Sequence, residues 1–84
     1  MPKYNGHKNR NHWNVSLWLN NDEGLYRLMC DKVRYTRRFG GTRDDAAEAL
    51  RVLLADTGRT HTPDGAPYSV SAIRAAMVGL EARR

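Results

Sequence analysis

The side chains best suited to chemistry in this 84-residue sequence are arginines that cluster around a tyrosine. Arg34, Arg37 and Arg38 flank Tyr35, and guanidinium groups beside an aromatic ring suit phosphate contacts and stacking. On a helix, Arg27, Arg34 and Arg38 recur at i, i+7 and i+11, which lines them along one exposed strip. We call these five residues the basic strip and predict that it binds a partner.

A second interpretation of the basic strip is local electrostatics. Arg34, Arg37 and Arg38 crowd the end of a predicted helix, where cations meet the negative end of the helix dipole. Dipole capping and partner binding therefore stay open as alternatives. Secondary candidates for partner binding are the basic residues Lys3, Lys8, Arg10 and Arg74.

Few residues in the sequence have the types and spacing that catalysis or metal binding requires. His7 and His12 are five residues apart, not the three or four that would place both rings on one helical face. Cys30 is the single cysteine, so we expect neither an internal disulfide nor a zinc site. We expect its side chain to be buried as a small apolar group. The adjacent Asp44 and Asp45 diverge on a helix and are expected to be first-turn charges. We predict a protein that is not an enzyme and uses no cofactor or metal.

Apolar spacing predicts three clear helices that would carry these side chains. They cover residues 22–38, 42–56 and 69–82, and start at the cap residues Asn21 or Asp22, Thr42 and Ser69. Gly40-Gly41 and Gly58 end the first two helices, because glycine accepts positive φ. Gly40-Gly41 also precedes a helix, but without a preceding strand or a following Lys-Ser it could hold at most an isolated anion.

Residues 12–20 are ambiguous between strand and helix. Trp13, Val15 and Leu17 alternate with polar residues as in a half-buried strand, but Trp18 breaks the alternation. A lone strand would have no partner, so we favour a short helix. We expect at least one of the two tryptophans to lie in the core.

The length of the chain limits how many domains it can form. One hydrophobic core is all that 84 residues supply, so we expect a single all-α domain over residues 1–84, a small bundle of three to four helices. Residues 1–11 are expected to be a flexible, basic arm. So thin a core makes a homodimer a candidate assembly.

The charge balance favours acidic partners. The chain has 14 Lys and Arg against 9 Asp and Glu, a formal net charge of +5, which suits polyanions or acidic protein surfaces. No apolar run approaches a transmembrane helix or a signal peptide, so we expect the cytoplasm and no membrane partner.

Several short motifs resemble a family of small bacteriophage- and plasmid-encoded proteins of uncharacterised function. The motifs are Tyr4-Asn5-Gly6, Trp13-Asn14-Val15, Leu17-Trp18, Asn20-Asn21-Asp22-Glu23-Gly24, Tyr26, Thr62-Pro63-Asp64-Gly65 and Tyr68. The resemblance implies an accessory protein that acts on host machinery. Among such accessories, anti-CRISPR proteins are stoichiometric inhibitors that bind their targets.

Two functions follow as hypotheses. The first is a non-enzymatic mobile-element accessory that binds and inhibits a host defence component in the host cytoplasm, with a subunit of a CRISPR-Cas effector complex as the partner that the resemblance suggests. The second is a small basic DNA-binding regulator, in which the last helix would read DNA. That helix offers Arg74 as its main long polar side chain, whereas base readout usually needs three or four.

Overall fold

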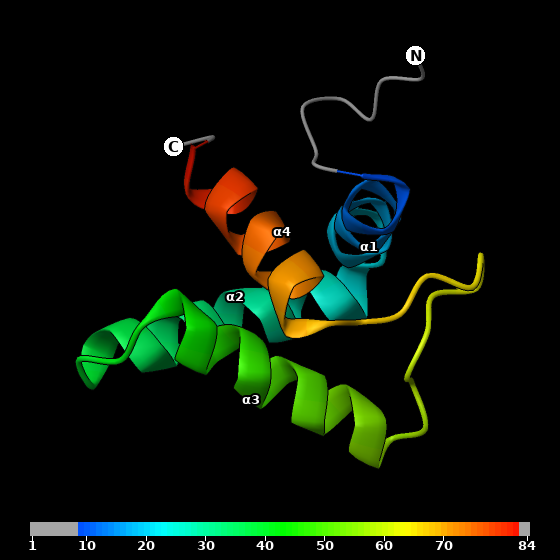
Figure 1. Cartoon of the computed structure of the whole chain (residues 1–84). Coiled ribbons are helices and arrows are strands. Elements are labelled where there is room, and N and C mark those ends of the chain that lie inside the picture. The colour runs from blue at the N-terminus through cyan, green and yellow to red at the C-terminus, as the bar shows by residue number, and fades with distance from the viewer. Residues whose placement is uncertain (1–8, 83–84) are drawn as a thin grey trace.

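Four helices account for most of the described chain (Figure 1). The computed structural model describes residues 9–82, with the side chains of residues 9–79. The helices are α1 (Arg10–Asn21), α2 (Glu23–Arg38), α3 (Arg43–Asp56) and α4 (Val70–Ala82). The small all-α bundle that the sequence predicts is confirmed. Within residues 9–82 no helix is both long and apolar enough to cross a membrane.

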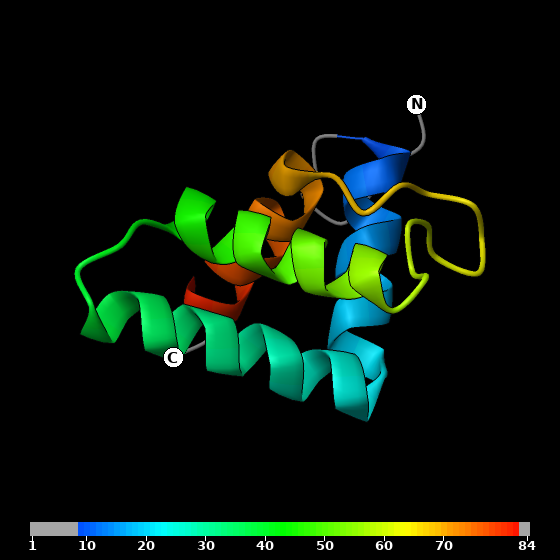
Figure 2. The same cartoon turned by 90° about the horizontal axis from the view of Figure 1, so that it is seen from below.

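The helices are arranged in two crossing layers. α2 and α3 run antiparallel side by side, and α1 and α4 cross over them (Figures 1 and 2). The main contacts join α1 to α2, α2 to α3, α3 to α4, and α4 back to α1. The four helices therefore form a closed ring of packing interfaces around one core.

The core lies between the two layers and is built from all four helices. Its largest fully buried apolar side chains are Val15, Leu19, Met29, Leu50, Leu54, Ile73 and Met77. α3 and α4, which pack against each other, both contribute fully buried alanines, such as Ala47 and Ala72. Such small side chains let the backbones of two helices approach closely.

Local signals set the ends of α2 and α3 as predicted. Asp22 caps α2 by accepting a hydrogen bond from the Leu25 amide at 3.0 Å. α3 starts in a capping box, in which Thr42 Oγ1 accepts from the Asp45 amide and Asp45 Oδ2 accepts from the Thr42 amide. Gly40, at φ 77°, follows α2 in the left-handed conformation that favours glycine.

The first helix differs from the prediction in where it begins and in how deeply its two tryptophans are buried. It begins at Arg10, because the Asn9 side chain accepts from the His12 amide at 2.9 Å and caps a helix that starts two residues earlier. The predicted arm therefore loses its last two residues to α1, and the rest of it, apart from the cap, lies outside the described residues. The expectation of a core tryptophan is wrong: Trp13 and Trp18 are both only partly buried.

Candidate binding surface

An exposed aromatic pair marks the end of α2. The rings of Tyr35 and Phe39 lie with their centroids 4.7 Å apart at an interplanar angle of 46°. Tyr35 is 65% exposed and Phe39 is 69% exposed. Large apolar side chains are normally buried, so two such rings in contact on the surface form a candidate interface.

Arginines border this aromatic pair. Arg34 and Arg38 are one helical turn apart and both are exposed. Arg34 has a weak ion pair, with 4.0 Å between its Nη1 and Oδ1 of Asp31. We call Arg34, Tyr35, Arg38 and Phe39 the exposed α2 face. It combines two cations with two aromatic rings, residue types that are common at binding hot spots and in stacking contacts.

The other members of the basic strip are placed differently. Arg27 pairs with Glu23, with 2.5 Å between Nη2 and Oε1, so its charge is compensated locally. Arg37 lines a hollow formed by α2, α3 and α4. The structure thus keeps Arg34, Arg38 and Tyr35 together and separates Arg37 from them.

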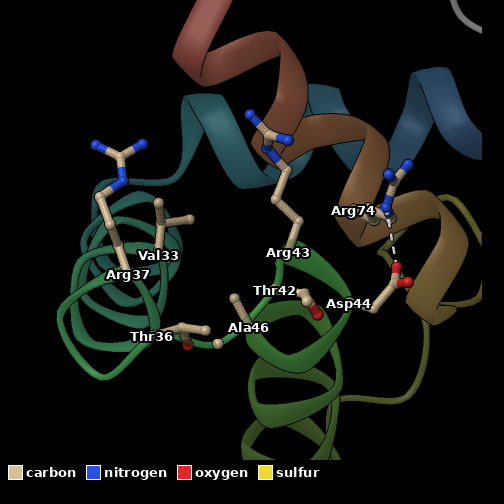
Figure 3. Close-up of a pocket in the computed structure, with 10 residues that line it drawn as sticks. Val33, Thr36, Arg37, Thr42, Arg43, Asp44, Ala46 and Arg74 are labelled. Carbon is tan, nitrogen blue, oxygen red and sulfur yellow. Dashed lines mark ion pairs between the residues drawn. The ribbon is translucent and has the colours of Figure 1, made fainter.

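The hollow has a volume of about 550 Å³ and lies where α2, α3 and α4 meet (Figure 3). We call it the α2–α3 hollow. It is lined by Val33, Thr36, Arg37, Gly40, Gly41, Thr42, Arg43, Asp44, Ala46 and Arg74. Arg43 was not among the predicted binding residues, because its place in the same hollow as Arg37 and Arg74 depends on how three helices pack.

The secondary candidates do not form one surface. Arg10 Nη2 donates to the backbone oxygen of Asp64 at 3.4 Å, on the loop side of the molecule. Arg74 Nε lies 2.9 Å from Asp44 Oδ1 and belongs to the α2–α3 hollow. Lys3 and Lys8 lie outside the described residues.

A polar network that the sequence analysis missed ties the loop before α4 to α1. Asp64 Oδ2 accepts from Asn14 Nδ2 at 2.9 Å and from Trp18 Nε1 at 3.0 Å. Thr62 Oγ1 donates to Asn14 Oδ1 at 2.5 Å, and both residues are buried. The hydrogen bond from Asn14, followed by that from Trp18, lowers the pKa of the Asp64 carboxyl group. These side chains hold one another in place, so the network positions the loop.

The residues considered for catalysis are dispersed. His12 Nε2 lies 2.9 Å from Ser71 Oγ, and Cys30 is half-buried on α2. In the described part of the chain, no three His, Cys, Asp or Glu side chains gather as a metal site requires. Asp44 pairs with Arg74, and Asp45 caps α3.

The comparison with protein families decides where this chain belongs. The model of a family of unknown function, DUF7249, matches residues 1–81. The chain belongs to the DUF7249 family. No curated protein and no solved structure matches it.

The DUF7249 match covers each candidate site described above. It includes the exposed α2 face, the α2–α3 hollow and the Asp64 loop. Each candidate site of this DUF7249 protein is therefore part of the family domain itself.

Proposed function

We propose that this DUF7249 protein is a non-enzymatic accessory of a mobile genetic element that binds and inhibits a host defence component. The exposed α2 face is the interface. The observation that carries the proposal is the contact between Tyr35 and Phe39, which stay 65% and 69% exposed beside two arginines.

The chemistry of the exposed α2 face favours an acidic protein surface as the partner. Covering the two rings removes apolar surface from water, which contributes about 25 cal/mol for each Å². Arg34 and Arg38 would meet carboxylates on the partner and set its orientation. The ion pair between Arg34 and Asp31 is weak, since it spans 4.0 Å, and binding would cost little by breaking it.

The class of partner comes from the resemblance to phage and plasmid proteins. An accessory of this size acts by occupying a surface of a larger complex, and a CRISPR-Cas effector subunit is the specific target that we propose. Binding would take place in the host cytoplasm.

Affinity capture from a host with an active CRISPR-Cas system tests this proposal. We expect the tagged chain to recover an effector subunit, and its expression to raise phage plating on that host. Arg38→Glu and Phe39→Ala should each lower recovery at least tenfold, because hot-spot losses of more than about 1.4 kcal/mol have that effect. Arg59→Glu is the matched control, since Arg59 is exposed in the loop after α3. Capture without any effector subunit, together with unchanged plating, would overturn the proposal.

Nucleic acid is a second candidate partner, favoured by Arg34 and Arg38, one turn apart on α2, beside rings that can stack on bases. Two phosphate contacts on duplex DNA predict a slope of about −1.8 for log affinity against log salt. A mobility-shift series across salt concentrations measures that slope. Absence of duplex binding at low salt ends this alternative.

A second copy of the chain could also cover the exposed α2 face. Sedimentation velocity of the wild-type chain and of Phe39→Ala distinguishes this assembly. A dimer that Phe39→Ala dissociates would assign the face to self-association and would count against the host-protein proposal.

A further inference from the structure

The α2–α3 hollow is lined by arginine side chains that come from separate helices. Arg37, Arg43 and Arg74 come from α2, α3 and α4, and their guanidinium groups extend to the same side in Figure 3. Three arginines and one aspartate, Asp44, are the charged residues among those that line the hollow.

We propose that the α2–α3 hollow binds a small phosphate-bearing ligand. Its volume of about 550 Å³ lies within the range of about 300–1,000 Å³ that is typical of small-molecule sites. Guanidinium groups bind phosphate oxygens in a bidentate manner, which gives both charge and orientation. Val33 and Ala46 supply an apolar part of the wall, against which the remainder of the ligand would pack.

The carboxylate of Asp44 does not prevent this binding. Its Oδ1 lies 2.9 Å from Arg74 Nε, so its charge is compensated within the hollow. A guanidinium has five N–H donors, and an arginine that holds one internal partner can still donate to a ligand. The ion pair also holds Arg74 in place, which reduces the entropy lost when an anion binds.

The arginines would supply the positive charge that neutralises the ligand. α3 begins at the hollow, but its capping box already occupies the amide groups of Thr42 and Asp45. The connection beside it is also tightly packed, since a Cβ placed on Gly41 would overlap the Thr36 side chain. The backbone around the hollow is therefore fixed, and the guanidinium groups are the side-chain donors that would contact a ligand.

Isothermal titration with two probes, inorganic pyrophosphate and adenosine diphosphate, tests the proposal. We expect saturable binding of at least one probe at millimolar concentration or below. Equal affinities would assign the site to phosphate groups alone, whereas tighter binding of the nucleotide would show that the apolar wall also contributes. Absence of binding by both probes would overturn the proposal.

Variants locate the binding. Arg43→Gln and Arg37→Gln should each weaken the affinity at least tenfold, and Arg59→Gln, outside the hollow, should leave it within twofold. Arg37 is exposed, so its variant should keep the helical circular dichroism of the wild type and stay informative even if Arg43→Gln disturbs the start of α3. Equal weakening by Arg59→Gln would mean a diffuse charge effect and no site.

Ligand binding in the α2–α3 hollow can be tested separately from partner binding at the exposed α2 face. Phe39→Ala removes an aromatic ring from the exposed α2 face without touching the lining of the hollow. It should leave probe affinity within twofold while lowering partner recovery. Loss of probe binding in Phe39→Ala would contradict the assignment to the hollow.

Discussion

Replacing Thr62 by valine isolates the contribution of the network between α1 and the loop before α4. Thr62 is 4% exposed; its Oγ1 donates to Asn14 Oδ1 at 2.5 Å and accepts from the Ala66 amide at 3.1 Å. Valine has the same shape, so Thr62→Val removes both hydrogen bonds without leaving a cavity. The Asn14 oxygen and the Ala66 amide would then be buried without these partners.

The expected loss is large for a domain of this size. An unsatisfied buried polar group costs about 1–3 kcal/mol, and the added methyl group returns about 0.8 kcal/mol. Two such groups at about 2 kcal/mol each, less the methyl contribution, give an expected loss of about 3 kcal/mol in the free energy of unfolding of Thr62→Val. The total for a chain of this length is about 4–12 kcal/mol. At about 4–8 °C for each kcal/mol, Tm should fall by about 10–25 °C.

Urea and thermal unfolding, followed by circular dichroism, measure this loss. Thr62→Ser keeps the hydroxyl group and loses a methyl group, so it should be destabilised by only about 1 kcal/mol. Thr60→Val changes an exposed residue of the same loop and should stay within about 0.5 kcal/mol of the wild type. If Thr62→Val were as stable as Thr62→Ser, apolar packing would dominate at this position and the reasoning would be refuted.

Three further predictions concern other parts of the structure. Because hydrogen bonds lower the folded-state pKa of Asp64, its stabilisation is complete above the ordinary aspartate pKa of about 4 and is lost as pH falls through the lower folded value. Thermal melts at pH 6 and at about pH 3 should therefore show a smaller acid destabilisation in Asp64→Asn than in the wild type. Gly41→Ala should cost about 1–3 kcal/mol in urea unfolding through overlap with Thr36, and adding Thr36→Ser should restore most of it. Leu50→Ala, at a fully buried position, should cost about 2–5 kcal/mol by the same measurement.

Local signals explain why most helices could be predicted. Thr42 with its following acids, and Gly40 and Gly58 at positive φ, act within a few residues of themselves. Their effects can therefore be deduced without knowledge of packing. The earlier start of α1 depends on Asn9, a local cap hidden within a polar stretch that predicts an arm.

Contacts between distant segments could not be deduced in this way. The hydrogen bond between Thr62 and Asn14 joins residues 48 positions apart, and the α2–α3 hollow needs Arg74 beside the start of α3. Their formation depends on how α4 packs against α1 and α3. Phe39 is a different case, because its i+4 spacing from Tyr35 was available as a signal for a ring pair.

The closed ring of interfaces has a consequence for how the domain opens. No helix can detach without breaking contacts with both of its neighbours, so the opening of any one helix costs two packing interfaces. Amide hydrogens in the buried faces of all four helices should therefore exchange through one common opening. The last turn of α2 is different, because residues 37–40 are all exposed. Its amide hydrogens should therefore exchange through local openings that leave the core closed.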